Sequence, residues 1–175
     1  EDEAVNRLVE CIVYDINIEK LNPSRDILVI ILNELDKDKY IKKITSRLNY
    51  ENINFYIPAC SKANILKEDR WQNEKKEKYW EDNAVTISTI LNAKGNEAPM
   101  VYVIGAEYIA EREEDISYRN KLFTALTRAK CWVKLIGIGD YPLYSEIVQA
   151  INANGKFKFK FKRVAKESND TELEE

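Results

Sequence analysis

The sequence predicts an α/β domain whose β-sheet is mainly parallel and is flanked by helices. Apolar runs of strand length alternate along the chain with segments of helical period, an order typical of this class. The run at 26–32 is apolar on both faces of a strand, which favours a parallel sheet buried between helix layers. A chain of 175 residues is long enough for one domain with its own core.

The first third of the chain supplies two predicted helices and two predicted strands. Residues 3–19 have apolar side chains at a helical period, and an Asn-Pro-Ser sequence at 22–24 ends this helix. The strand at 26–32 follows. Residues 36–48 are predicted to form a helix with one apolar face, and 53–57 a short strand that a proline ends.

Residues 61–82 are rich in charged side chains around Trp71 and Trp80, and we expect a charged elaboration outside the sheet. Both tryptophans are candidates for stacking on bases, but we favour a role as buried anchors of a long loop. The remaining predicted elements are a strand at 85–90, a turn at 92–99, a strand at 100–104, a charged connection at 107–115, a helix at 116–130, a strand at 132–138 and a helix at 143–153.

Lysine and phenylalanine alternate at 156–162, which predicts a strand with phenylalanines on one face and lysines on the other. We favour a sheet-edge strand with solvated lysines. The alternative is a platform whose phenylalanines stack on bases. The domain is therefore predicted to span residues 1–165, followed by an acidic, disordered tail at 166–175.

Composition excludes several classes of function. The 30 acidic and 27 basic side chains give no global positive field, so any nucleic-acid binding must come from a local patch. The absence of histidine excludes Ser-His triads and histidine-liganded metals. Three scattered cysteines predict no metal site, no disulfide framework and a reducing, cytoplasmic setting, with Cys11 and Cys131 as buried thiols. No apolar run approaches the ~18–20 residues that span a membrane. The sequence begins without methionine, and we expect a longer polypeptide.

A glycine turn between two predicted strands is the first candidate for chemistry. Gly95 permits a backbone conformation, or a close approach to a ligand, that a Cβ forbids. Lys94 and Glu97 bracket this turn, whose N–H groups are able to face an anion or a ribose. An ordinary loop with solvated charges is the alternative.

The predicted helix at 116–130 is the second candidate. Its apolar side chains pack on the sheet, while Asn120, Thr124 and Arg128 are spaced by four and share another face. Arg128 comes just before the strand at 132–138, which places it near the edge where the parallel strands begin. A surface charge without a catalytic role is the alternative for this arginine.

Taken together, the two segments resemble the late motifs of superfamily 1 helicases of the UvrD/Rep type. The motif residues are Thr89, Ala93-Lys94-Gly95-x-Glu97 and Thr127-Arg128-Ala129-Lys130, and the strand at 26–33 is similar to an earlier motif of the same family. The resemblance implies the second, C-terminal RecA-like domain of an ATP-dependent DNA or RNA helicase. It also implies as partners an N-terminal RecA-like domain of the same polypeptide and a single strand of DNA or RNA.

The resemblance further implies a role for individual residues. Arg128 corresponds to the catalytic arginine that reaches the γ-phosphate across the interdomain cleft. Lys94, Gly95 and Glu97 correspond to the ATP-binding segment. Thr89 and Asn92 lie in the segment that contacts nucleic acid. The resemblance implies ATP and Mg²⁺ as cofactors, held mainly by the N-terminal domain.

The sequence also departs from the family pattern. Leu91 stands where many relatives have histidine, and Ile31 stands where arginine is often found. The family's large inserted subdomain does not fit between Asn33 and Val85. No glycine is followed by Lys-Ser or Lys-Thr, so the P-loop is absent from this sequence and we expect the chain alone to hydrolyse no ATP. The alternative function is a non-catalytic nucleic-acid or protein interaction module that retains the RecA-like fold.

Overall fold

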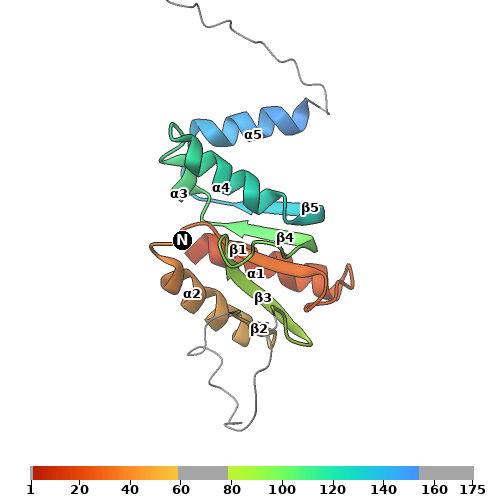
Figure 1. Cartoon of the computed structure of the whole chain (residues 1–175). Helices are drawn as coiled ribbons and strands as arrows, with labels where there is room; N and C mark the ends of the chain where they lie inside the picture. The colour runs from red at the N-terminus through yellow and green to blue at the C-terminus, as the bar shows by residue number, and fades with distance from the viewer. Residues whose placement is uncertain (1, 59–78, 154–175) are drawn as a thin grey trace, which may run out of the picture.

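A computed structural model describes residues 2–58 and 79–153 of the chain. The described strands form one sheet in the order β2-β3-β1-β4-β5, in which every neighbouring pair is parallel, and helices cover both faces (Figure 1). The elements are α1 (Asp2–Asn17), β1 (Ile27–Ile31), α2 (Lys37–Tyr50), β2 (Asn54–Tyr56), β3 (Ala84–Thr89), β4 (Ala98–Ile104), α3 (Glu107–Ala110), α4 (Ile116–Leu126), β5 (Ala129–Ile136) and α5 (Pro142–Asn152). The predicted α/β class with a parallel sheet is confirmed.

The central strand β1 explains the two-layered core. All five of its residues are buried, and alternate side chains enter different apolar clusters. Val29 and its neighbours on the same face pack with Leu8 of α1 and Ile44 of α2. Leu28 and Ile30, on the opposite face, pack with the segment after β3 and with α4 and α5. A strand covered in this way has to be apolar on both faces, as the sequence of 26–32 predicts.

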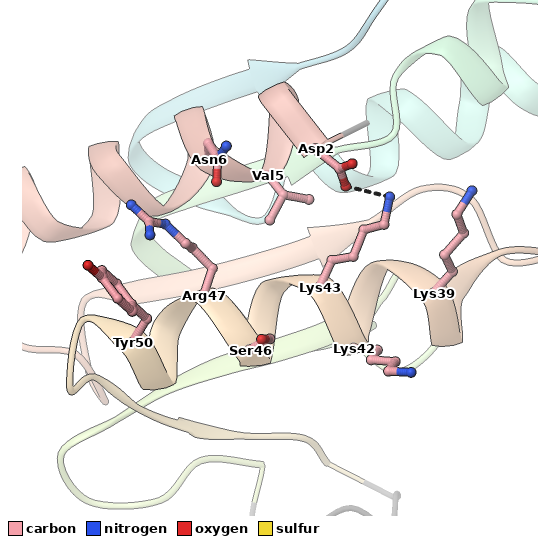
Figure 2. Close-up of a pocket in the computed structure, with 9 residues that line it drawn as sticks. All are labelled: Asp2, Val5, Asn6, Lys39, Lys42, Lys43, Ser46, Arg47 and Tyr50. Carbon is pink, nitrogen blue, oxygen red and sulfur yellow. Dashed lines mark ion pairs between the residues drawn. The ribbon is translucent and has the colours of Figure 1, made fainter.

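Helices α1 and α2 lie side by side on the first of these faces, and Figure 2 shows the groove between them. The apolar side chains of each helix face the sheet, and polar side chains line the groove. Lys43 forms an ion pair with Asp2 at 2.6 Å across it, but the Asp2 side chain is 82 % exposed. A pair so exposed contributes about 1 kcal/mol or less, so the packing of the two helices depends mainly on their buried side chains.

Two predicted boundaries in the second half are wrong. The helix predicted to reach residue 130 ends at Leu126, and β5 begins at Ala129, where it pairs with Ala98 of β4. Pairing with the sheet therefore overrides the helical period at 127–130. The predicted charged connection at 107–115 contains the short helix α3, and all four residues of α3 are buried. The burial of Glu107 is tolerated because its carboxylate has hydrogen-bond partners.

Several predictions concern residues outside those the structure describes. These are most of the elaboration at 61–82, including Trp71, the strand at 156–162 and the tail at 166–175. Residues 79–82, the described end of the elaboration, belong to no strand. None of the helices in the described ranges is long and apolar enough to cross a membrane.

Candidate functional site

The connection between β3 and β4 shapes the first part of the site. The two strands lie on either side of β1, so residues 90–97 run from the carboxyl edge of the sheet back to its amino edge across one face of β1. Ile90 and Ala93 are buried in the same cluster as Leu28. The N–H of Ala93 donates to the carbonyl of Thr89 at 2.9 Å, and the N–H of Asn96 donates to that of Ala93 at 3.0 Å. These turns make a short crossover that contains no helix.

The crossover separates the predicted site residues into two groups. Thr89 is the last residue of β3, at the carboxyl edge, and Asn92 is exposed in the first turn after it. Gly95 and Glu97 lie at the other end, just before β4 begins at the amino edge. The structure therefore does not bring the residues assigned to nucleic acid and those assigned to ATP into one cluster.

Gly95 has the left-handed conformation that favours glycine, with φ of +86°. A Cβ built on it would meet no heavy atom within 4 Å. Of the two reasons proposed for this glycine, the structure supports the backbone conformation, because no neighbouring protein atom crowds the position. Lys94 and Glu97 on either side are exposed, so the turn is open to solvent.

Arg128 lies in the turn between α4 and β5, at the amino edge, as its position before a strand predicts. Its carbonyl accepts a hydrogen bond from the N–H of Ala98 at 3.1 Å. This bond joins the start of β5 to the start of β4. Because Ala98 directly follows Glu97, the bond places Arg128 at the same edge of the sheet as the end of the crossover.

The side chain of Arg128 folds back on the end of α4. Its Nε donates to the carbonyl of Thr124 at 3.2 Å, and Nη2 lies 3.4 Å from Oγ1 of Thr127. The hydroxyl of Thr124 in turn donates to the carbonyl of Asn120 at 2.8 Å. A guanidinium at a helix C-terminus satisfies terminal carbonyls and interacts well with the helix dipole. These contacts hold the Arg128 side chain against the end of α4, although Arg128 itself lies beyond Leu126, the last residue of the helix.

A hollow of about 550 Å³ opens at the amino edge beside the crossover. Gly95 and Glu97 line it, and Arg25 and Lys130 add positive charge. Sequence patterns did not identify Arg25, because it comes from a loop before β1 that only folding brings to this edge. Lys130 belongs to the helicase-like motif, but its sequence position alone assigns it no role.

The floor of the hollow contains a buried hydroxyl. Thr86 of β3 is 3 % exposed, and its Oγ1 has no hydrogen-bond partner among the described residues. Tyr79 and Trp80 also line the hollow, and burial raises the pKa of Tyr79. Trp80 is 42 % exposed, so the expectation of a buried anchor is wrong for this tryptophan. Its indole borders the hollow, and the protein core does not enclose it.

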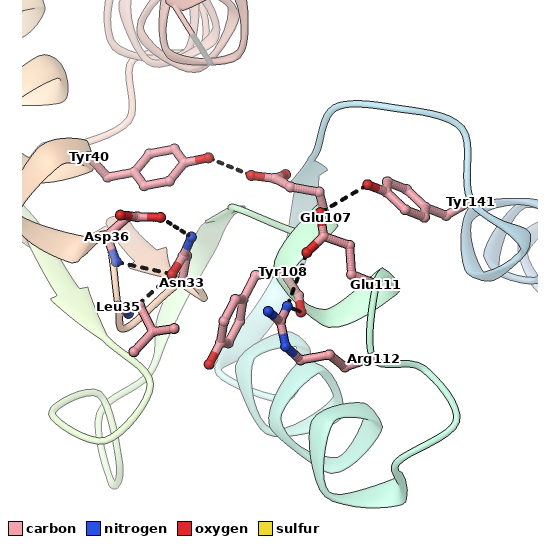
Figure 3. Close-up of polar contacts among 9 residues, drawn as sticks. All are labelled: Asn33, Leu35, Asp36, Tyr40, Glu107, Tyr108, Glu111, Arg112 and Tyr141. Carbon is pink, nitrogen blue, oxygen red and sulfur yellow. Dashed lines mark hydrogen bonds and ion pairs between the residues drawn. The ribbon is translucent and has the colours of Figure 1, made fainter.

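The carboxyl edge is organised by internal polar contacts (Figure 3). The side-chain oxygen of Asn33 accepts hydrogen bonds from the N–H groups of Leu35 and Asp36, both at 3.1 Å, which fixes the turn into α2. The buried carboxylate of Glu107 accepts from the hydroxyl of Tyr40 and from the N–H of Ile138 at 3.3 Å. These contacts connect α2, α3 and the segment after β5, so their first role is structural.

The two positions at which the sequence departs from the family pattern, Ile31 and Leu91, lie in different surroundings. Ile31 is completely buried in β1, whereas Leu91 is 71 % exposed beside Asn92.

The prediction that Cys11 and Cys131 are buried thiols is wrong, because Cys131 is exposed and Cys11 is half-buried. Cys131 lies in the first half of β5, one of the two outer strands of the described sheet, where the edge position leaves it open to solvent.

Comparison with known families adds independent information. Residues 84–136 match the UvrD-like helicase C-terminal domain family, and this range contains the crossover, Arg128 and strands β3 to β5. No curated protein matches the chain. Together with the parallel sheet and its flanking helices, this match over residues 84–136 supports similarity to the C-terminal domain of UvrD-like helicases.

Proposed function

We propose that this domain completes the ATP site of a DNA or RNA helicase motor and contributes to its binding of a single strand. A helicase C-terminal domain works with an N-terminal domain and with nucleic acid. The observation that carries the proposal is the hydrogen bond from the N–H of Ala98 to the carbonyl of Arg128. This bond holds the end of the glycine turn and the candidate catalytic arginine at one edge of the sheet.

The position of this edge favours a nucleotide presented by a neighbour. A nucleotide bound by a parallel α/β domain on its own lies beyond the carboxyl ends of the strands. The Gly95 turn and Arg128 lie at the opposite edge. ATP and Mg²⁺ are therefore assigned mainly to the N-terminal domain, and this chain adds contacts from across the cleft. When bound, ATP supplies the γ-phosphate whose loss allows such a cleft to reopen.

The residues at the amino edge fit a phosphate-bearing ligand. Gly95 leaves open space where a side chain would stand, and Arg25 and Lys130 supply positive charge. The unpartnered hydroxyl of Thr86 offers a buried hydrogen-bonding group. In Arg128, Nε and Nη2 have protein partners, while Nη1 donates to no acceptor in the described part of the chain. A planar guanidinium held in this way keeps donors for a phosphate.

A non-catalytic interaction module is the second candidate function. Two observations favour it: Ile31 is buried where relatives often have arginine, and Leu91 is exposed where many have histidine. Neither side chain supplies the polar contact of the usual residue. Such a module would retain the fold and would not require Arg128 for ATP hydrolysis.

Strand-stimulated ATP hydrolysis separates the two functions. In a polypeptide that contains both motor halves, we expect Arg128→Ala and Arg128→Lys each to lower the rate at least ~100-fold, because a lysine does not reproduce the planar fork. Arg112→Ala is a matched control, since Arg112 also donates to a carbonyl four residues earlier, that of Tyr108 at 2.9 Å. A normal rate for Arg128→Ala would support the interaction module.

A further inference from the structure

The groove between α1 and α2 is lined by a row of basic side chains. Figure 2 shows Lys39, Lys43 and Arg47 along one side of α2, directed toward α1, whereas Lys42 points away. The groove encloses about 620 Å³. Because the three residues are spaced by four, consecutive charges rise by ~6 Å along the helix. The row is a local concentration of positive charge on a chain whose net charge is −3.

The acidic partners in this groove are weakly held. Lys43 pairs with Asp2, whose side chain is 82 % exposed, and Arg47 pairs with Glu51 at 3.1 Å near the end of the helix. The Lys43–Asp2 pair, exposed in this way, contributes about 1 kcal/mol or less, so an anion of higher charge density replaces it at little cost.

Arg47 also lacks a partner for one of its donors. Its Nε is buried and has no hydrogen-bond acceptor among the described residues. A buried guanidinium N–H without an acceptor costs free energy, which a ligand oxygen in the groove would recover. This observation is independent of the row of charges and also indicates an anionic ligand.

The end of the groove favours a nucleic acid over an acidic protein. Tyr50 is 74 % exposed, and the guanidinium of Arg47 lies over its ring, 4.8 Å from the centroid. An exposed aromatic ring beside a row of cations is a platform on which a base stacks. A protein partner would require apolar anchors, and the only aliphatic side chain that lines the groove, Val5, is 3 % exposed.

We propose that this groove is a second binding site for single-stranded nucleic acid, with Lys39, Lys43 and Arg47 on the phosphates and Tyr50 stacked on a base. The site lies on the face of the sheet covered by α1 and α2, whereas the crossover and α4 lie on the other face. It therefore goes beyond the proposed function and does not depend on the Arg128 edge.

Fluorescence anisotropy of a labelled oligothymidylate, measured with this chain at several salt concentrations, tests the site. The double variant Lys39→Gln/Lys43→Gln removes two phosphate contacts. The slope of log K against log salt should therefore become shallower by ~1.4, with a loss of affinity at low salt. Arg7→Gln/Lys37→Gln is the matched control, because it removes the same charge from exposed positions of α1 and α2 outside the groove. Equal effects of the two double variants, or no effect of the first, would overturn the proposal.

Two further variants separate a binding role from a structural one. Asp2→Asn should strengthen binding, because it removes the carboxylate that competes with phosphate for Lys43, whereas loss of a structural ion pair would weaken it. Tyr50→Ala should lower affinity for the single strand and leave the salt slope unchanged, and Tyr50→Phe should retain affinity. If Tyr50→Ala binds normally, or if polyglutamate of equal charge or duplex DNA competes as well as the single strand, the assignment is wrong.

Discussion

The buried carboxylate of Asp15 on α1 holds the ammonium group of Lys134 on β5, with Oδ1 and Oδ2 at 3.0 and 2.9 Å from Nζ. The two residues are 119 positions apart in the sequence. The hydroxyl of Tyr102, on the intervening strand β4, donates to the same carboxylate. These contacts connect helix α1 to β5, one of the two outer strands of the described sheet.

Asp15→Ala should destabilise the domain by about 2–4 kcal/mol. The substitution leaves the Tyr102 hydroxyl buried without its acceptor and removes the partner of Lys134. The lower part of this range is favoured because the Lys134 side chain is 37 % exposed and water compensates part of the loss. Urea unfolding measures the difference. Asp2→Asn, which breaks the exposed pair with Lys43, is the control and should cost less than ~1 kcal/mol. If Asp15→Ala and Asp2→Asn lower the free energy of unfolding by similar amounts, the buried contacts of Asp15 contribute no extra stability.

Stability should fall as the pH rises above about 10. Burial raises the pKa of Tyr102 well above its ordinary value of 10.0, and the Asp15 carboxylate adds to the shift. The folded state therefore keeps its proton where the unfolded state loses it. This contribution to stability is complete below the unfolded pKa and declines at higher pH. Urea unfolding at pH 9 to 11 measures the decline, on the order of 1.4 kcal/mol per pH unit for one such tyrosine. An equally steep decline in Tyr102→Phe would exclude Tyr102 as its source.

Tyr40→Phe should cost about 1.5–3 kcal/mol, the usual range for a hydrogen bond to a charged group. The Tyr40 hydroxyl donates to Glu107, and both side chains are buried at the carboxyl edge. Tyr50→Phe provides a control on the same helix, since its ring is 74 % exposed, and its stability should not change. Thermal unfolding of both variants checks this. If Tyr40→Phe melts at the same temperature as the unsubstituted protein, the hydrogen bond from Tyr40 to Glu107 in Figure 3 contributes no net stability.

Gly95→Ala should separate stability from activity. An alanine there meets no neighbouring atom within 4 Å but must adopt φ near +86°, which costs ~1–2 kcal/mol. Glu97→Gln at the exposed end of the crossover should leave stability unchanged. If this turn contacts the nucleotide, both variants lower strand-stimulated ATP hydrolysis in the two-domain polypeptide. Normal hydrolysis by a folded Glu97→Gln variant would remove Glu97 from the proposed site.

The sequence predicts the centre of the sheet better than its outer parts. The strand at 26–32 is recognisable because burial on both faces requires an unbroken apolar run. The end of α4 is not, because residues 127–130 suit a helix and only pairing with Ala98 makes β5 begin at Ala129. Cys131 is predicted to be buried because its neighbours in the sequence are apolar, but the edge position of β5 exposes it.

The candidate site likewise has one part that the sequence predicts and another that only folding brings together. The position of Arg128 just before a predicted strand places it where the strands begin, and the structure has it at that edge. The hollow beside it combines Arg25, Tyr79 and Lys130 from three separate segments. No local period relates these segments, since only the parallel order of β3, β1, β4 and β5 brings their ends together. The assigned roles in ATP and nucleic-acid binding remain predictions.

The crossover at 90–97 has a consequence for how the two edges of the domain communicate. Where a helix joins parallel strands, its rotation and sliding absorb small displacements before they reach the next strand. Here the connection is only eight residues of backbone, with Ile90 and Ala93 fixed in the core between its ends. A displacement of Thr89 or Asn92 would therefore reach Gly95 and Glu97 along the main chain itself. The short connection thus joins the carboxyl edge of the sheet directly to its amino edge.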